Sequence, residues 1–142
     1  NEPPADILRI RALVGLDVVQ LHGDEPRDQW PRQSRLWRAI RVDETFDPAL
    51  LEAPEVEAFL LDAPSGEAYG GTGTRFDWKR AVRAGGRVIL AGGLDEENVV
   101  EAIRTVRPWG VDACSRLEAA PGRKDRPKMV RFIRAALAGD PE

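Results

Sequence analysis

The sequence holds 142 residues, 42% of them hydrophobic, which is the length and apolar content of one globular domain with a real core. The net charge is -3, and the basic residues are interspersed among a larger number of acidic ones, which argues against a nucleic-acid partner. A lone cysteine rules out an internal disulfide framework, and no apolar stretch or signal-peptide pattern indicates a membrane, so we expect a soluble cytoplasmic protein with a single domain over residues 1–142.

Helical and strand-like patterns alternate along the chain. Apolar residues at helical spacing follow Pro3-Pro4 and stop at Gly15, which predicts a helix over residues 5–14. Short apolar runs predict five strands, at residues 17–21, 36–42, 56–62, 88–91 and around Val111. The remaining segments predict helices at residues 25–35, where the pattern is weaker, and at 46–51, 77–84, 95–106 and 124–137.

The strand at residues 88–91 ends in a pattern typical of an anion site. Gly92 and Gly93 follow it and lack the Cβ atoms that would block a ligand. Asp95 then stands where a helix N-cap belongs, so backbone N–H groups at a helix start are expected close to the glycines. The strand around Val111 repeats the plan, because it also ends in small polar residues.

Strands that alternate with helices through short connections predict a parallel sheet with right-handed crossovers. An open doubly wound sheet would usually carry G-x-G-x-x-G after its first strand, and that motif is absent there. A (β/α)₈ barrel instead predicts small and polar residues after several strands, with phosphate held after the last two. The second pattern fits. We therefore expect an α/β fold that is a partial (β/α)₈ TIM barrel with five strands.

Five motifs in one order carry a resemblance to a known family. They are QLHGDE at residues 20–25, LLD at 60–62, GGTG at 70–73 with FDW at 76–78, LAGGL at 90–94 with ENV at 97–99, and Glu118 with PGRKD at 121–125. Together they resemble phosphoribosylanthranilate isomerase of tryptophan biosynthesis. The resemblance runs from Asn1 to about Ala138 and covers the carboxy-terminal two-thirds of the family's barrel, strands 4 to 8 with their helices. It implies that the first three strands are missing.

The resemblance also implies a chemistry. Family members perform an Amadori rearrangement with a general acid and a general base, and need no metal or organic cofactor. Asp62 matches the acid, and a carboxyl at an apolar barrel mouth is desolvated, which keeps its proton available near neutral pH. The family's base is a cysteine on the first strand, outside this chain. His22, the lone histidine, makes no metal site and is by default structural.

Further positions match the family's binding of a small phosphorylated substrate. By resemblance, the barrel mouth, the glycine-rich loop and the phosphate clamp supply Gln20, His22, Gly71, Gly73, Gly92, Gly93, Asp112, Cys114, Ser115 and Arg116.

The clamp departs from the family at the last strand, where DVSSGVE is usual and this chain reads DACSRLE at residues 112–118. Arg116 replaces a glycine whose backbone can take a positive φ that arginine disfavours, although a guanidinium could instead pair with the phosphate. Cys114 replaces a serine of similar size, and a further hypothesis makes it a substitute for the absent base.

Five strands leave two open sheet edges that a closed barrel would not have. The chain is then a split enzyme that needs an N-terminal barrel segment, a chain that self-associates through those edges, or a non-catalytic fragment that binds a phosphorylated ligand. A different phosphate-binding barrel, indoleglycerol-phosphate synthase, is disfavoured because it needs a catalytic lysine on a barrel strand. None of the three lysines here ends a predicted strand.

Overall fold

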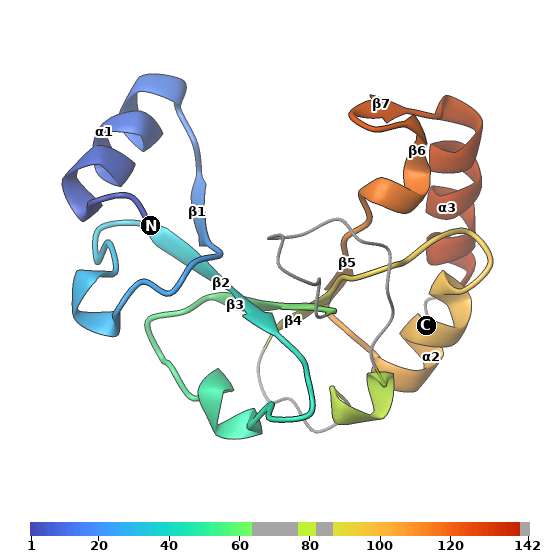
Figure 1. Ribbon diagram of the computed structural model, residues 1–142, viewed down its shortest axis with the longest axis horizontal. Helices are drawn as coiled ribbons and strands as arrows, with labels where there is room; N and C mark the ends of the chain where they lie inside the picture. Colours follow the sequence, from blue (N-terminus) through green and yellow to red (C-terminus); the bar gives the residue numbers. More distant parts are fainter. Residues whose placement is uncertain (64–76, 82–86, 140–142) are drawn as a thin grey trace.

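The structure, a computed structural model, describes residues 1–63, 77–81 and 87–139. Within these ranges five parallel strands form one sheet in chain order. They are β1 (Val18–Leu21), β2 (Arg35–Arg41), β3 (Ala58–Asp62), β4 (Val88–Leu90) and β5 (Gly110–Val111). Figure 1 shows them as a curved sheet. The predicted α/β fold with five parallel strands is confirmed.

Three α-helices and several short turns accompany the strands. The helices are α1 (Pro4–Val14), α2 (Val99–Val106) and α3 (Arg126–Gly139), of which α2 lies between β4 and β5. Single 3₁₀ turns are η1 (Arg27–Gln29), η2 (Pro48–Leu51), η3 (Trp78–Arg80) and η4 (Ser115–Leu117). Gly15 ends α1 in the left-handed conformation at φ 73°, as its place in the sequence predicts. None of the described helices is long and apolar enough to cross a membrane.

The predicted helix at residues 25–35 is wrong, because this segment holds only the turn η1. Two prolines explain the difference. Pro26 precedes the turn, and Pro31 would remove a backbone N–H from the middle of the expected helix. Trp30 follows the turn in an extended conformation, and its indole N–H donates to the carbonyl of Glu25 at 3.0 Å.

Other boundaries also differ from the sequence prediction. The predicted helix at 77–84 is described only over residues 77–81, where the turn η3 lies. The helix predicted from Asp95 becomes regular at Val99, after a turn. A small antiparallel hairpin, β6 (Glu118–Ala120) with β7 (Arg123–Lys124), precedes α3 and was not predicted.

Both faces of the sheet are apolar. The larger cluster includes Leu61 and Leu90, and the buried face of α2 packs into it. A smaller cluster occupies the opposite face and consists of Ala39, Ala58, Leu60, Ile89 and Ala91, with Trp37 packed against it. Because side chains alternate along a strand, Asp62 continues the face of Leu60 and leaves the cluster only where β3 ends.

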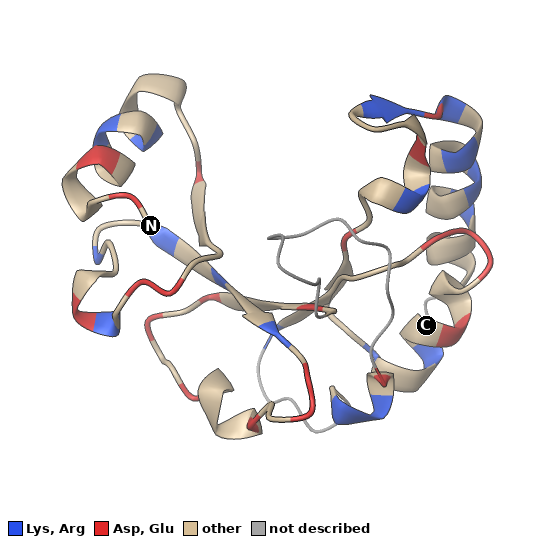
Figure 2. Ribbon diagram, viewed as in Figure 1, with Lys and Arg blue, Asp and Glu red and all other residues tan. Residues whose placement is uncertain are grey.

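Charged side chains at the amino ends of the strands pair with one another. Glu57, just before β3, accepts two hydrogen bonds from Arg35 at 2.7 Å each and lies 3.4 Å from Arg87. The guanidinium of Arg87 also stacks over the ring of Trp109, which makes an edge contact with Trp37 at 5.9 Å between ring centroids. Figure 2 shows basic and acidic segments interspersed along the chain, with the basic ones most frequent along β7 and α3.

Candidate active site

The carboxyl ends of the parallel strands bring several predicted site residues to one edge of the sheet. His22 follows β1, Asp62 ends β3, and Gly92 follows β4. Nε2 of His22 lies 3.8 Å from Oδ2 of Asp62. A β-carbon added at Gly92 would lie 3.0 Å from Oδ1 of the same carboxyl. The carboxyl of Asp62 therefore lies between His22 on one side and, on the other, the turn formed by Gly92 and Gly93, here called the glycine turn.

The surroundings of Asp62 raise the pKa of its carboxyl above the ordinary value. The largest cause is burial, since the side chain is only 16% exposed and the charged form is poorly solvated. The negative charge of Asp112 raises this pKa further, whereas the N–H of Ala63 and the charges of His22 and Arg41 lower it. Burial outweighs these opposing contributions, so Asp62 retains its proton to a higher pH than an exposed aspartate does.

The glycine turn requires glycine at Gly92 for two reasons. Its φ of 84° is left-handed, and an added β-carbon would lie 2.5 Å from the backbone nitrogen of Ala63. Gly93 is also left-handed, at φ 66°. The backbone of the turn can thus approach the end of β3 closely, which a side chain at Gly92 would prevent.

Asn98 fixes the glycine turn; it belongs to the ENV motif at residues 97–99, but it was not predicted to be a site residue. Of the residues that the structure describes, it is the one polar residue that is buried, at 5% exposure. Its Nδ2 donates to the carbonyl of Gly93 at 3.0 Å, and its Oδ1 accepts from the N–H of Asp95 at 3.2 Å. An asparagine three residues after an aspartate, at the end of a glycine turn, was the available signal.

Asp95 caps the turn before α2 and not the regular helix itself. Its Oδ1 accepts from the N–H of Glu97 at 3.0 Å and from that of Asn98 at 3.1 Å. The predicted capping role therefore holds for a segment that begins earlier than the regular helix.

The segment after β5 is tied to the hairpin by Lys124. The ammonium donates to the carbonyl of Cys114 at 2.9 Å, to its Sγ at 3.0 Å, and to Oε1 of Glu118 at 2.9 Å. The hydrogen bond with Cys114, followed by that with Glu118, raises the pKa of Lys124. Cys114 is exposed and Ser115 begins η4. The thiol is thus engaged with the hairpin lysine.

Of the two alternatives left open for Arg116, a strained positive φ and pairing with the phosphate, the structure does not show the first. Arg116 lies in η4, and Arg107, at φ 51°, is the only non-glycine residue with a positive φ in the part of the chain that the structure describes. Nη1 of Arg116 lies 3.5 Å from Oδ2 of Asp95. The guanidinium therefore reaches from the segment after β5 to the turn that follows Gly93.

Gln20 and His22 line a hollow of about 370 Å³ beside β1. The loop that carries His22 is held by Arg38, which donates to the carbonyl of Gly23 at 2.6 Å and to Glu25 at 2.7 Å. Burial alone would raise the pKa of Glu25, but hydrogen bonds and the charge of Arg38 lower it overall. The predicted residues Gly71 and Gly73 lie outside the described residues. No group of three metal-ligating side chains occurs in the described ranges.

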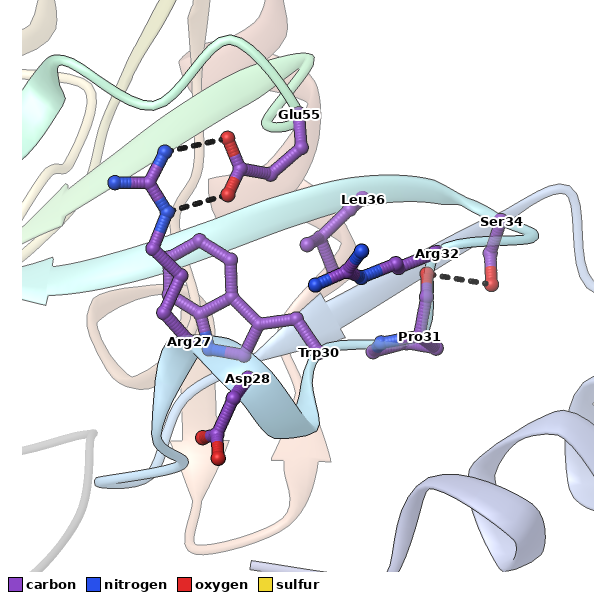
Figure 3. A pocket seen from close by; sticks show the side chains of 8 residues that line it. All are labelled: Arg27, Asp28, Trp30, Pro31, Arg32, Ser34, Leu36 and Glu55. Atoms are coloured by element: carbon purple, nitrogen blue, oxygen red, sulfur yellow. Dashed lines mark hydrogen bonds and ion pairs between the residues drawn. The ribbon is translucent and has the colours of Figure 1, made fainter.

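A separate hollow of about 590 Å³ lies at the amino end of β2, away from Asp62. Figure 3 shows Arg27 reaching Glu55 beside the ring of Trp30, with Leu36 at the base. This hollow lies beside the segment where the predicted helix at residues 25–35 is reduced to a single turn.

Comparisons with known proteins agree with this geometry. The family described as "N-(5'phosphoribosyl)anthranilate (PRA) isomerase" matches residues 1–135. An N-(5'-phosphoribosyl)anthranilate isomerase from Solibacter usitatus is 49% identical over 138 residues, which are 97% of this chain and 69% of the relative. One from Rubrobacter xylanophilus is 45% identical over 96% of this chain and 69% of the relative.

Solved structures show the same likeness. Phosphoribosyl anthranilate isomerase from Thermotoga maritima is similar with a TM-score of 0.84 and 36% identity, over 97% of this chain and 70% of that one. A phosphoribosyl anthranilate isomerase in complex with reduced 1-(o-carboxyphenylamino)-1-deoxyribulose 5-phosphate matches with a TM-score of 0.80 and 34% identity, over 97% of this chain and 68% of that one. The alternative of indoleglycerol-phosphate synthase gains no support from these relatives. In sequence and in fold, the chain belongs to the N-(5'-phosphoribosyl)anthranilate isomerase family.

Proposed function

We propose that this chain supplies the general acid and the phosphate site of a phosphoribosylanthranilate isomerase of tryptophan biosynthesis. The reaction converts N-(5-phosphoribosyl)anthranilate into 1-(2-carboxyphenylamino)-1-deoxyribulose 5-phosphate. The observation that carries the proposal is the half-buried Asp62, with its raised pKa, at the carboxyl edge of the sheet between His22 and Gly92. Membership of the isomerase family supports it.

Asp62 is the acid in this proposal. Its proton passes to the ring oxygen of the ribose, and the bond between that oxygen and C1′ breaks to give an open-chain iminium. A base then removes the proton on C2′, and the electron pair of that bond neutralises the iminium to form an enamine with an enol. Tautomerisation of the enol gives the ketone. A raised pKa suits Asp62 to the first step, because a general acid must hold its proton near the working pH.

The phosphate in this proposal lies against the two turns that follow β4 and β5. Gly92 and Gly93 allow close approach of the backbone, and Ser115 and Arg116 lie in η4, from which Arg116 reaches Asp95. Successive backbone N–H groups in a turn favour a bound anion. Gln20, His22, Asp112, Gly71 and Gly73 complete the proposed substrate-binding set, while Cys114 contributes through its place in the same segment.

The base in this proposal comes from a strand that these residues do not contain. The chain spans 69% of its Solibacter usitatus relative, so a closed barrel needs further strands. We propose that residues 1–142 act as one domain, the carboxy-terminal two-thirds of a barrel, and that activity requires a segment with the first three strands. Action in the cytoplasm, where a lone cysteine stays reduced, is part of this proposal.

An isomerase assay tests the proposal directly. The chain is assayed alone and after refolding with a fragment of the Solibacter usitatus relative that carries its first three strands. We expect turnover only in the mixture, and loss of that turnover with Asp62→Asn. Turnover by the chain alone would contradict the need for a further segment. A mixture in which Asp62→Asn remains fully active would contradict the assignment of the acid.

A non-catalytic role in binding a phosphorylated ligand is the second candidate. Saturable phosphate binding by the chain, together with no turnover in any mixture, would support this role over the enzyme.

A further inference from the structure

The loop that carries His22 is tied to β2 through Arg38. This arginine lies opposite Leu21 in the register of β1 and β2, one residue before His22. Its guanidinium donates to the carbonyl of Gly23 at 2.6 Å and to Oε2 of Glu25 at 2.7 Å. The same Oε2 accepts from the N–H of Gly23 at 3.1 Å. Both backbone polar groups of Gly23 are therefore held, directly after His22.

The Arg38–Glu25 pair is well buried. The two side chains are 14% and 9% exposed, whereas those of the neighbouring Arg27–Glu55 pair are 57% and 39% exposed. Both arginines lie over the ring of Trp30, with guanidinium carbons at 5.6 Å and 5.9 Å from its centroid (Figure 3 shows the ring with Arg27). A buried pair is costly to break, because the remaining charge stays desolvated. The loop therefore has one strongly preferred conformation.

The other side of this loop meets Asp62. Side chains alternate along a strand, and Leu21 packs into the larger core cluster, so His22 projects to the opposite face of the sheet, the face of Asp62. There Nε2 of His22 lies 3.8 Å from Oδ2 of Asp62. The side chain of His22 is 43% exposed, so packing alone does not fix the imidazole. Its place depends on the backbone that carries it.

We infer that the Arg38–Glu25 pair positions His22 against the carboxyl of Asp62, which makes Arg38 a positioning residue of the candidate active site. Arg38 acts through the loop, because its hydrogen bonds go to Gly23 and Glu25 and not to the carboxyl of Asp62. The bearing of this arrangement on catalysis rests on the proposed function, in which Asp62 is the acid. The arrangement itself can be tested without that function.

The titration of Asp62 reports where His22 stands. The charges that act on the carboxyl are those of His22 after β1, Arg41 at the end of β2 and Asp112 after β5. The first two lower the pKa of Asp62, and the third raises it. Of these three groups, only His22 lies on the loop that Arg38 holds. Release of the loop should therefore remove one lowering contribution and leave the other two charges in place.

Carbon-13 NMR of the Asp62 carboxyl tests the inference in the chain of 142 residues, without any need for turnover. Arg38→Met keeps an unbranched side chain beside Trp30 but removes both hydrogen bonds, so the pKa of Asp62 should rise toward its value in His22→Gln. Combined with His22→Gln, the same change should add no further rise. Arg27→Met is the matched control, because it removes a cation from the same ring without touching the loop, and it should leave this pKa unchanged.

Arg38→Lys provides a second variant. Its ammonium keeps the charge but has no planar fork to hold both Gly23 and Glu25, so the rise should be smaller than in Arg38→Met. If Arg38→Met does not fold, Arg38→Lys decides alone, by a rise that disappears in the His22→Gln background.

Three results would overturn the inference. The pKa of Asp62 could stay unchanged in folded Arg38 variants, or it could rise equally in Arg27→Met. It could also rise as much with His22→Gln present as without it, because Arg38 would then act by its own charge and not through the histidine. Each of these results leaves Asp62 as the proposed acid. Conversely, full turnover of Asp62→Asn in the refolded mixture would contradict the proposed function and leave the positioning of His22 intact.

Discussion

The carboxylates of Glu55 and Glu57 at the amino edge of the sheet and that of Asp62 at the carboxyl edge are perturbed in opposite directions. At the amino edge, hydrogen bonds from Arg27 lower the pKa of Glu55 to about 2, and those from Arg35 lower the pKa of Glu57. At the carboxyl edge, burial raises the pKa of Asp62. The same residue chemistry therefore yields stable exposed ion pairs at one edge and a retained proton at the other.

The backbone conformation also differs between the two edges. At the carboxyl edge, Gly92 and Gly93 take left-handed conformations and the buried Asn98 holds them in place. At the amino edge, the charged partners are side chains on the surface of regular strands and turns. Among the residues that the structure describes, the carboxyl edge alone thus combines left-handed glycines, a buried polar side chain and an acid with a raised pKa, which is the combination expected at a functional site.

The largest effect that tests this comparison is on catalysis. Asp62→Asn should lower turnover in the complemented barrel by about 10²–10⁴-fold, the usual contribution of a general acid. Glu57→Gln, at the amino edge, is the matched control and should leave turnover near its original value. A steady-state assay of both variants decides the matter, and equal losses in the two would remove the distinction between the edges.

The next effect is on stability. Gly92→Ala places a β-carbon at a left-handed φ and against the backbone of Ala63, and should reduce the free energy of unfolding by about 2–4 kcal/mol. Gly122→Ala, at φ 74° with open space around it, should cost only about 1–2 kcal/mol. Urea unfolding of the two variants measures the difference. Equal costs would mean that close approach to β3 is not a constraint.

A smaller effect concerns the titration of Asp62. Asp112→Asn removes a negative charge that raises the pKa of Asp62, so this pKa should fall; His22→Gln removes a charge that lowers it, so it should rise. Carbon-13 NMR of the Asp62 carboxyl reads both shifts. In the proposed mechanism Asp62 acts in its protonated form, so the alkaline limb of the rate profile should move in the same directions. Shifts of the opposite sign would disprove the assigned causes.

The raised pKa of Asp62 also makes the free energy of unfolding depend on pH. The folded chain binds this proton more tightly than the unfolded chain does, so Asp62 disfavours folding as pH rises from the ordinary value of 3.8 to the raised one.

The smallest effect lies at the amino edge. The Arg27–Glu55 pair stabilises the fold above the ordinary pKa of 4.5, and this contribution is lost as pH falls to about 2. Both groups are exposed, so screening keeps the effect small. Arg27→Gln should flatten the fall of the urea midpoint over that range, while Arg9→Gln on α1 should not.

Much of the fold could be predicted because the hydrophobic periodicity and the residues that end helices and strands indicate the same elements. Apolar strands alternate with helices, and Gly15 ends α1 as expected. The segment at 25–35 was misjudged because Pro31 outweighs its weak helical pattern. The hairpin at 118–124 could not be found, since its strands are too short to show a period.

The candidate site divides in a similar way. The positions of Asp62 and Gly92 could be predicted, because parallel strands collect their carboxyl ends at one edge. The contact of Arg38 with Gly23 could not, since it joins residues 15 apart in the sequence. The contacts of Asn98 are local, and their signal, an asparagine three residues after Asp95, was missed. The positive φ that the usual glycine left open for Arg116 is not found in this backbone.

The fluorescence of Trp109, which packs against Trp37, can report the pairing of a further strand with β5. The planes of their rings are nearly perpendicular, at 89°. Trp109 lies just before β5, the last strand of the sheet, and is 52% exposed. A segment that paired with β5 and continued the curve of the sheet would pass beside this indole and exclude water from it. Its fluorescence should then move to shorter wavelength as the barrel closes, so closure can be followed by light before any product is formed.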